Sequence, residues 1–321
     1  MLHFLFQRLL LLCVTLLLLI IISFSISWLP IDAPLDGKPI VQAFNAYLGL
    51  LIDFDLGISS VSQQSILEQL IVVFPATLEL AFLSFLVAVM LGIPLGVISA
   101  LYEDKLVDKI LRIFSLMGFS MPVFWVGLIF ILYFSLKYDT LPLSGRLDWR
   151  YEVDFVTGFL FIDVWYMPEQ IRGYIINDML RHLLLPVLTL TIAPLAEITY
   201  LVRTNCIEVN NSLYVKAART RRINSFTIVR RHILPNALPE LIPRFGSLFS
   251  SMLTMAIITE YVFTWPGMGR WLINAIRQDD YASISAGVLA IGLLVILINT
   301  ITNILAILLS PQDKKEWLTL G

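Results

Sequence analysis

Six long apolar runs set the tightest limit on what this chain can fold into. They lie at 9–29, 76–101, 113–136, 183–202, 245–264 and 285–309. A helix needs about 20 apolar residues to cross the hydrocarbon core of a bilayer, and these runs are close to that length or longer. Because lipid leaves the backbone of a lone strand without hydrogen-bond partners, each run is expected to be a helix. The sequence therefore predicts an all-α polytopic membrane protein with six transmembrane helices.

The first run is expected to stay in the mature protein. It is longer than the apolar core of a secretory signal, and no A-x-A cleavage pattern follows it. Six spans place both termini on the same side of the membrane. We therefore expect residues 1–75 to hold the first helix and an outside loop, 76–309 to form a five-helix core, and 310–321 to be a tail.

The positions of Lys and Arg orient the chain. With the N-terminus inside, the inside segments and their basic residues are 1–8 with 1, 102–112 with 3, 203–244 with 8 and 310–321 with 2, which is 14 of the total 22. Inside loops carry an excess of Lys and Arg, and long outside loops weigh little in this rule. Both termini are thus predicted to be cytoplasmic, with long outside loops at 30–75 and 137–182.

Composition removes several functional classes. Hydrophobic residues make up 58% of the chain and charged residues 14%, and the net charge of −2 gives no sign of a nucleic-acid partner. Cys13 and Cys206 lie far apart, so neither a disulfide framework nor a metal site is indicated. His3, His182 and His232 show no spacing of metal ligands or of a catalytic triad. We expect a protein that is not an enzyme and binds no metal.

The inside loop 203–244 is the part of the chain with the largest net charge. It has eight basic residues and two acidic ones, a net charge of +6. Tyr214, Ala217, Ala218 and Arg221 recur at the spacing of one helical face, and two alanines at its centre would let another backbone approach closely.

A second short helix is expected after a turn in the same loop. Asn224 or Ser225 is suited to cap it. Phe226, Val229 and Ile233 would form an apolar stripe on this helix, and Pro235 is expected to end it.

Two interpretations of this loop remain open. Its charges can rest on anionic lipid headgroups, as in any positive-inside loop. Alternatively, the loop is a docking surface for a cytoplasmic partner. The lipid interpretation explains the charge but not the alanine pair or the compact helix–turn–helix.

The loop resembles the coupling loop of binding-protein-dependent ABC importers, in particular the permeases of the dipeptide and oligopeptide branch. It contains "LYVKAARTRRI" from 213 and "RHILPNALP" from 231. Six further motifs are similar to the family in order and spacing: "DLGIS" at 55–59, "FPATLEL" at 74–80, "GIPLGV" at 92–97, "FSMPVFW" at 119–125, "LPLSGR" at 141–146 and "EYVFTWPGMGRW" from 260. Within the branch, the second outside loop and the "KEW" tail look most like the B-type permeases of Sap systems, which are associated with antimicrobial-peptide uptake and resistance.

The chain departs from the family pattern at two positions. Leu213 replaces an aspartate, and Arg222 replaces the glycine between the two short helices. Glycine takes positive φ without a steric penalty. Arg222 must therefore accept about 1 kcal/mol of strain, or Asn224 must take the left-handed position instead.

The resemblance implies the type I importer permease fold, a place in the inner membrane of a bacterium, and a set of partners. These are a second related permease, two cytoplasmic ATP-binding subunits, a periplasmic substrate-binding protein and the surrounding lipid. ATP would be bound by the partners, because the chain has no G-x-x-x-x-G-K-[ST] sequence and needs no cofactor of its own. The residues implied to dock the ATPase are Tyr214, Val215, Ala217, Ala218, Arg219, Arg222, Ile223, Phe226, Val229, Arg231, His232, Ile233, Asn236 and Pro239.

Three acidic residues in the apolar runs are candidates for the transport path. Glu79 and Glu260 lie near the outer ends of their runs, and Glu197 lies deeper. Carboxylates in a membrane usually face protein or a water-filled cavity, so they either line a path for a cationic or zwitterionic peptide or hold helices together.

The sequence leaves other cargo and another transport mechanism as alternatives. A polyamine or a metal complex is an alternative cargo within the same family. A secondary transporter would show inverted repeats, and none is evident in the sequence.

Overall fold

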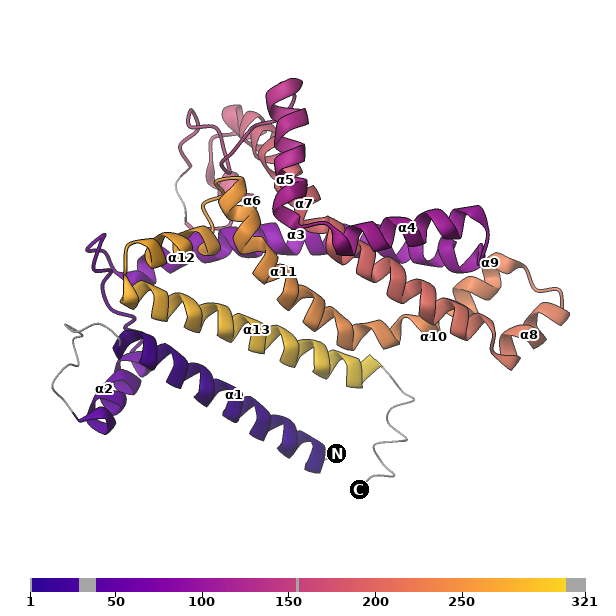
Figure 1. Cartoon of the computed structure of the whole chain (residues 1–321), viewed down its shortest axis with the longest axis horizontal. Helices are drawn as coiled ribbons and strands as arrows, with labels where there is room; N and C mark the ends of the chain where they lie inside the picture. The colour runs from indigo at the N-terminus through magenta and orange to yellow at the C-terminus, as the bar shows by residue number, and fades with distance from the viewer. Residues whose placement is uncertain (1, 29–38, 154–155, 310–321) are drawn as a thin grey trace. The chain divides into compact units, whose positions relative to one another are not determined.

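The computed structural model describes residues 2–28, 39–153 and 156–309, and these are almost entirely helical (Figure 1). The predicted tail 310–321 lies outside the described residues. The helices are α1 (Leu2–Trp28), α2 (Ile40–Ile52), α3 (Ile66–Leu101), α4 (Leu106–Ser120), α5 (Val123–Phe130), α6 (Leu160–Asp163), α7 (Glu169–Asn210), α8 (Leu213–Thr220), α9 (Ser225–Ile228), α10 (Leu234–Ala237), α11 (Ile242–Val262), α12 (Met268–Arg277) and α13 (Tyr281–Leu309).

Each predicted apolar run overlaps a helix or helix pair of membrane-spanning length. Among the described residues, α1, α3, α7, the helical stretch Ser225–Val262 and α13 are long and apolar enough to cross a bilayer. A sixth span is reached if the bent pair formed by α4 and the helix that follows it is counted as one. The expected all-α fold with about six spans is confirmed.

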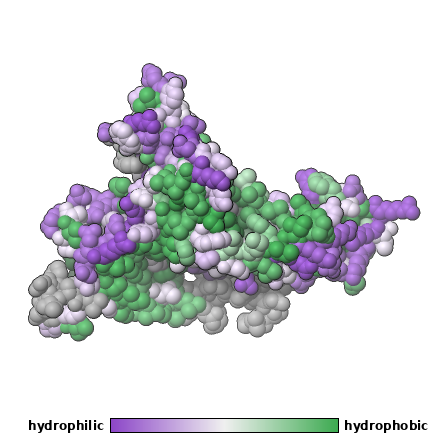
Figure 2. Space-filling view, turned by 45° about the horizontal axis from the view of Figure 1, so that its top comes forward, coloured by the Kyte–Doolittle hydropathy of each residue, from purple (hydrophilic) through white to green (hydrophobic). Residues whose placement is uncertain are grey.

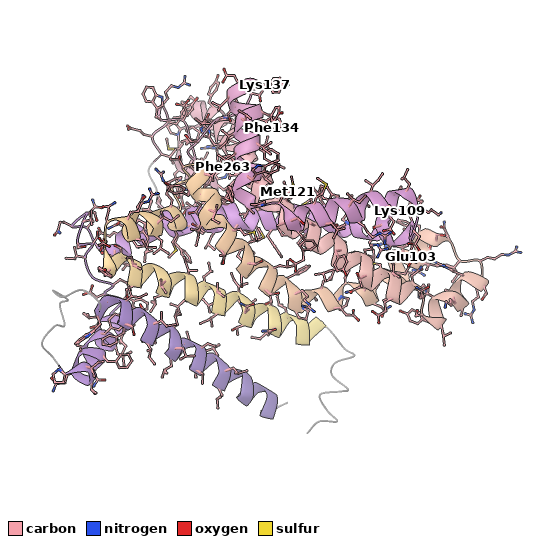
Figure 3. The ribbon with its side chains drawn as sticks, in the orientation of Figure 1. Glu103, Lys109, Met121, Phe134, Lys137 and Phe263 are labelled. Atoms are coloured by element: carbon pink, nitrogen blue, oxygen red, sulfur yellow. The ribbon has the colours of Figure 1, made fainter. Side chains whose placement is uncertain are left out.

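The third predicted span is not one straight helix. Leu106–Ser120 and Val123–Lys137 meet at 102°, and the second limb ends in a π-helical segment, Ile131–Lys137. Figure 3 shows Met121 at the corner, with Phe134 and Lys137 on one limb and Lys109 on the other. Met121 has the extended backbone, with φ −82° and ψ 125°, that the ring of a following proline favours. Pro122 therefore ends the first helix inside the predicted run.

Two helices extend well beyond the apolar runs that predicted them. The run 76–101 lies in α3, which has 36 residues, and the run 183–202 lies in α7, which has 42. At about 1.5 Å per residue these helices are about 54 and 63 Å long, which exceeds the thickness of a bilayer. Both helices continue past the apolar runs. The length of an apolar run therefore indicates where a span lies but not where its helix ends.

The chain divides into two compact units, each assembled from separated segments. Unit 1 consists of residues 1–79, 142–183 and 260–297. Unit 2 consists of residues 80–141, 184–259 and 298–321. The helices α3, α7, α11 and α13 each contribute residues to both units. The division into 1–75, 76–309 and 310–321 remains a prediction.

Unit 1 holds α1 against α2 and α13 with aromatic and hydroxyl contacts. The ring of Phe24 packs edge-on to Phe44 with centroids 5.2 Å apart. Ser23 Oγ lies 2.7 Å from the hydroxyl of Tyr47 and 2.8 Å from that of Ser285, and all three side chains are buried. Hydroxyl groups that satisfy one another in this way are a common means of joining helices in an apolar environment.

Unit 2 is built around a close approach of α3 and α4 to α7. A Cβ placed on Gly96 would lie 2.6 Å from Val202 Cβ and 2.7 Å from the backbone oxygen of Thr199. One placed on Gly118 would lie 2.6 Å from Ala196 Cβ. Together with Gly92, which faces Ile198 one turn away, these glycines let the helix backbones come closer than any side chain allows. They act as packing residues between the helices.

Candidate functional site

The basic loop folds as short helices at the end of α7. Helix α8 begins shortly after α7 ends, and a turn at 221–224 leads into α9. The π-helical segment Val229–Ile233 then joins α9 to α10. Figure 1 shows α8 and α9 together beyond the end of α7, and these two short helices contact each other. The predicted helix–turn–helix is present.

The turn uses Arg222 as the residue with left-handed backbone. Its φ is +54°, and its N–H donates to the backbone oxygen of Arg219 at 3.0 Å. Asn224 has φ −58° and caps α9 by accepting from the backbone N–H of Phe226 at 3.0 Å. Of the two arrangements expected for this turn, the one in which Arg222 bears the strain is therefore observed, and Asn224 is the capping residue.

The Arg222→Gly variant is expected to be more stable than the native chain, by up to about 1.5 kcal/mol. Relief of the left-handed penalty gives about 1–2 kcal/mol, and the extra chain entropy of glycine removes roughly 0.5–1 kcal/mol. The matched control is Arg221→Gly, because Arg221 has φ −79° and gains no such relief. SDS-induced unfolding in mixed micelles measures both. Equal destabilisation by the two variants would show that position 222 bears no strain.

The inner side of the loop is buried in unit 2. Val215 is fully buried and Ala218 is 7% exposed. They share an apolar cluster with residues of α3, α7 and α9 to α11: Ala88, Ala100, Leu195, Ile198, Val202, Cys206, Ile228, Ile233, Ala237, Leu241 and Leu248. These side chains fix the loop to its own unit and are not available to a partner.

The outer side of the loop combines exposed apolar and basic side chains. Leu213 is 85% exposed, Phe226 70% and Tyr214 47%. Figure 2 shows hydrophilic residues gathered at the end that carries α8 and α9. We call the following exposed residues the docking surface: Leu213, Tyr214, Lys216, Ala217, Arg219, Arg222, Phe226, Arg230 and Arg231.

The face predicted for α8 is divided by the structure. Ala217 points outward and is exposed, whereas Ala218 packs into the cluster. Val215 and Ala218 are three residues apart, so they form the buried face, and Tyr214 and Ala217 form the exposed one. The alanine pair therefore does not make one surface for a partner.

The stripe predicted for the second helix is also divided. Phe226 is exposed, Val229 is buried to an intermediate degree and Ile233 is 2% exposed. Hydrogen bonds in a π-helix join residues five apart, so the segment Val229–Ile233 turns the stripe away from the surface and into the core.

Pro235 does not end the second helix as expected. It lies in the first turn of α10, directly after the π-helical segment, and the helical stretch continues to Val262. The wider turn before it provides room for the proline ring and its missing N–H.

The other predicted docking residues lie between these two sides. Ile223, His232, Asn236 and Pro239 are half-buried. Asn236 donates through Nδ2 to the backbone oxygen of His232 at 2.7 Å, which ties the π-helical segment to α10. Their contact with an ATPase remains a prediction.

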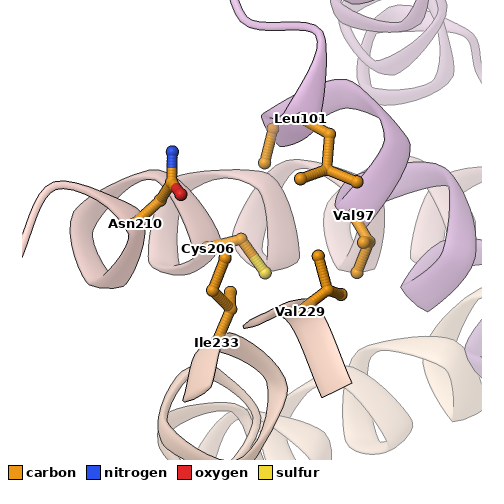
Figure 4. A pocket seen from close by; sticks show the side chains of 7 residues that line it. Val97, Leu101, Cys206, Asn210, Val229 and Ile233 are labelled. Carbon is orange, nitrogen blue, oxygen red and sulfur yellow. The ribbon is translucent and has the colours of Figure 1, made fainter. Parts of the chain in front are cut away.

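A small pocket lies under the loop, between α3, α7 and the π-helical segment (Figure 4). Cys206 faces it from α7 and is 2% exposed. The other lining residues are Val97, Ala100, Leu101, Asn210, Val229 and Ile233. The pocket is apolar except for Asn210 and belongs to the packing of the loop.

Glu260 caps α12 from a neighbouring helix. The backbone N–H groups of Gly269 and Arg270, at the start of α12, donate to its Oε2 at 2.7 and 3.1 Å. Thr77 Oγ1 donates to its Oε1 at 2.6 Å and accepts from the N–H of Met268 at 2.7 Å. The first N–H groups of a helix have no partner within it, and a carboxylate there is favoured by the helix dipole. The position before this helix is Gly267, whose missing side chain leaves room for the carboxylate.

Glu79 is part of a second buried polar group in unit 1. It forms an ion pair with Arg146, and both side chains are 4% exposed. Its Oε1 also accepts the N–H of Phe161 at 2.8 Å, while Arg146 Nη2 donates to the backbone oxygen of Gly158 at 3.1 Å. These contacts join α3 to the second long loop. For Glu79 and Glu260 they favour the structural interpretation over a place in the transport path, and Glu197, half-buried in unit 2, retains both.

Asp280 fixes the first long loop to the start of α13. Its carboxylate accepts from Ser59 Oγ at 2.5 Å, Ser60 Oγ at 3.1 Å and Ser283 Oγ at 2.7 Å. Burial acts to raise the pKa of Asp280, but these hydroxyls and two backbone N–H groups outweigh it and hold the pKa below its usual value. The carboxylate is therefore ionised at neutral pH.

The sequence did not single out the ion pair that lies beside the basic loop. Asp108 is fully buried at the start of α4 and pairs with Arg203 of α7, which is 95 positions away. The only signal was an acidic residue among three basic ones in 102–112, and Glu103 and Asp104 share it.

Comparison with known proteins places these features in a family. Residues 92–313 match the family described as "Binding-protein-dependent transport system inner membrane component". Peptide transport system permease protein SapB of Salmonella typhimurium is 50% identical over 317 residues, which is 99% of each chain. Putrescine export system permease protein SapB of Escherichia coli has the same identity and coverage. Di/tripeptide transport system permease protein DppB of Pseudomonas aeruginosa is 39% identical and covers 87% of this chain and 82% of that one.

A solved structure has the same fold. It is the inward-facing MetNI methionine ABC transporter, which aligns with a TM-score of 0.53 and 17% sequence identity. The alignment covers 73% of this chain and 93% of that one.

Proposed function

The chain belongs to the family of binding-protein-dependent transport system inner membrane components, and from this premise we propose how it works with its partners. It is a multi-pass permease of the inner membrane and not an enzyme, as its sequence predicts. We infer that it forms half of a peptide pathway. A second permease would complete the pathway, two ATP-binding subunits would drive it, and a periplasmic binding protein would deliver the cargo.

The main support for a partnership with ATP-binding subunits is that the basic loop has one buried side and one exposed side. Its inner side is packed against α3 and α7, so a force on the loop reaches the spanning helices through buried contacts. Its outer side presents three exposed apolar side chains among basic ones. Such a surface fits an apolar groove with an acidic rim on the ATP-binding subunit. ATP would be bound there and not by this chain.

The Ala217→Glu variant is expected to lose the ATP-binding subunits on co-purification while the chain itself stays folded. Ala217 is exposed on α8, so a carboxylate there meets the partner and not the core. The matched variant Ala218→Glu buries an unpaired charge in the cluster under α8 and is expected to destabilise the chain itself. Tagged chains are isolated in mild detergent, the co-purifying subunits are quantified, and thermal unfolding is followed. ATP-binding subunits retained in full by folded Ala217→Glu would overturn the docking surface.

The proposed orientation places the N-terminus and the basic loop inside the cell. Its support is the net charge of +6 on the loop 203–244. Labelling of an Arg222→Cys variant by a membrane-impermeant thiol reagent applied to intact cells would contradict this orientation.

A peptide is proposed as the cargo because peptide permeases predominate among the similar proteins. The equally similar protein named for putrescine export supports a polyamine as the second candidate, with the opposite direction of transport. Vesicles that contain the complete transporter, supplied separately with labelled cationic peptide and labelled putrescine, distinguish the two. A metal complex remains an alternative cargo of the family.

A further inference from the structure

The last two turns of α7 connect the basic loop to the rest of unit 2. Asn210 accepts from Arg219 Nη2 of α8 at 2.5 Å. Asn205 donates through Nδ2 to the backbone oxygen of Ala237, in α10, at 3.2 Å. Cys206, between them, packs under the π-helical segment (Figure 4). Any displacement of the loop is therefore transmitted to this end of α7.

A residue closer to the middle of α7 makes the link to α4. Arg203 Nε donates to Asp108 Oδ1 at 2.6 Å, and its Nη2 donates to Oδ2 at 2.8 Å. Asp108 also accepts from Ser99 Oγ of α3 at 2.6 Å and from the N–H of Asp104 at 2.9 Å. A two-pronged guanidinium–carboxylate contact fixes direction as well as distance. Three helices and the turn between α3 and α4 are thus joined at one buried carboxylate.

A second contact between α4 and α7, near the other end of α4, shows what the Arg203–Asp108 pair adds. Gly118 of α4 lies against Ala196 of α7, and this contact is apolar. With both contacts present, α4 is held to α7 at two points and must move with it. Without the ion pair, α4 would keep the contact at Gly118 and the packing of Ser115, which is buried on the same face, but it would lose the contact that fixes its direction. A buried ion pair is seldom needed for stability alone, because apolar residues of similar volume often serve as well.

We propose that Arg203 and Asp108 are positioning residues that make α4 move together with the basic loop. Movement of the loop by the ATP-binding subunits then passes through α7 to α4 and to the bend at Met121. The inference rests on the proposed function, since it assumes that the loop is the part the ATP-binding subunits move. It assigns the step from α7 to α4 to one side-chain pair.

The test uses the complete transporter reconstituted in vesicles, with cargo transported per ATP hydrolysed as the readout. Arg203→Gln and Asp108→Asn are expected to keep their ATP-binding subunits but to transport about tenfold less per ATP, a factor within the usual range for coupling between sites. The double variant is expected to be no worse than either single one, because both remove the same contact.

Arg112→Gln is the matched control. Arg112 lies on α4 itself, 3.7 Å from Asp108 Oδ2, so its removal changes the charge at the carboxylate without cutting the link to α7. It is expected to transport as much per ATP as the native chain. Native transport per ATP in Arg203→Gln, or an equal loss in Arg112→Gln, would overturn the proposal.

A third variant separates positioning from simple stability. The apolar pair Asp108→Leu with Arg203→Met is expected to fold and to keep the ATP-binding subunits, yet to remain uncoupled, because an apolar contact can slide. If this variant transports as much per ATP as the native chain, the ion pair is only structural and the proposal fails. A native chain that never retains ATP-binding subunits would instead refute the proposed function.

Discussion

Glu260→Ala is expected to lower the free energy of unfolding by about 3 kcal/mol or more, because each buried donor left unsatisfied costs about 1–3 kcal/mol. Two backbone N–H groups at the start of α12 and the hydroxyl of Thr77 lose their acceptor together. Because the total free energy of unfolding of a protein is about 5–15 kcal/mol, this loss is a large fraction of it. Unfolding in mixed detergent and SDS micelles, followed by circular dichroism, measures the loss.

Glu260→Gln is the control for this prediction. The amide oxygen can still accept from Gly269 and Arg270, and most of the stability should remain. The comparison also tests whether Glu260 belongs to the transport path. If the Glu260→Ala variant unfolds at the native SDS fraction but loses transport, the residue lines the path and its capping contacts carry little energy.

Gly96→Val is expected to produce the second large effect, a loss of roughly 1–3 kcal/mol or more from overpacking. The new Cβ alone would lie 2.7 Å from the backbone oxygen of Thr199, so α3 and α7 must separate. Backbone cannot rotate aside as the end of a side chain can. The same unfolding assay in mixed micelles measures the loss, and the substitution is also expected to reduce the fraction of chain extracted in folded form.

Substitutions at two further glycines are expected to have smaller effects, which tests the cause of the loss at Gly96. A Cβ on Gly92 would meet mainly the side chain of Ile198, with the nearest backbone oxygen at 3.4 Å, so Gly92→Ala should cost less than Gly96→Ala. Gly173, within α7, has nothing within 4 Å of the position of a Cβ. Gly173→Ala should therefore be neutral or stabilising by roughly 0.5–1 kcal/mol, as for an open helical site. A uniform response at the three positions would contradict the close approach of α3 and α7.

The sequence predicted the spanning helices because hydropathy determines where a helix can lie in lipid. It did not predict their ends, since α7 begins with Glu169 in polar sequence and extends past the apolar run in both directions. The break at Pro122 was visible as a proline, but only the extended conformation of Met121 shows that the helix turns there. Helix ends and corners depend on local backbone contacts that an average over apolar residues does not contain.

The basic loop shows the same division between what can and cannot be predicted. Local sequence rules predicted the two short helices and limited the cap to Asn224 or Ser225. The resemblance pointed to position 222 as the strained residue, with a left-handed Asn224 as the alternative. Which alanine faces outward does not, because periodicity gives the face that Ala217 and Ala218 share but not the direction of the core. The pair of Asp108 and Arg203 depends on two helices far apart in sequence, and a single sequence holds no record of their meeting.

The two units also constrain the order in which the protein can be made. Unit 1 takes its last segment from 260–297, and unit 2 takes residues after 298. A ribosome must therefore synthesise about nine-tenths of the chain before either unit has all its parts, unlike a protein whose domains fold one after another. The hydrogen bond from Thr77 to Glu260, beside α12 in unit 1, cannot form until Glu260 has been synthesised. Glu260 lies 183 positions further along the chain. Until then the contacts that fix the start of α12 cannot form, so both units can reach their folded state only near the end of synthesis.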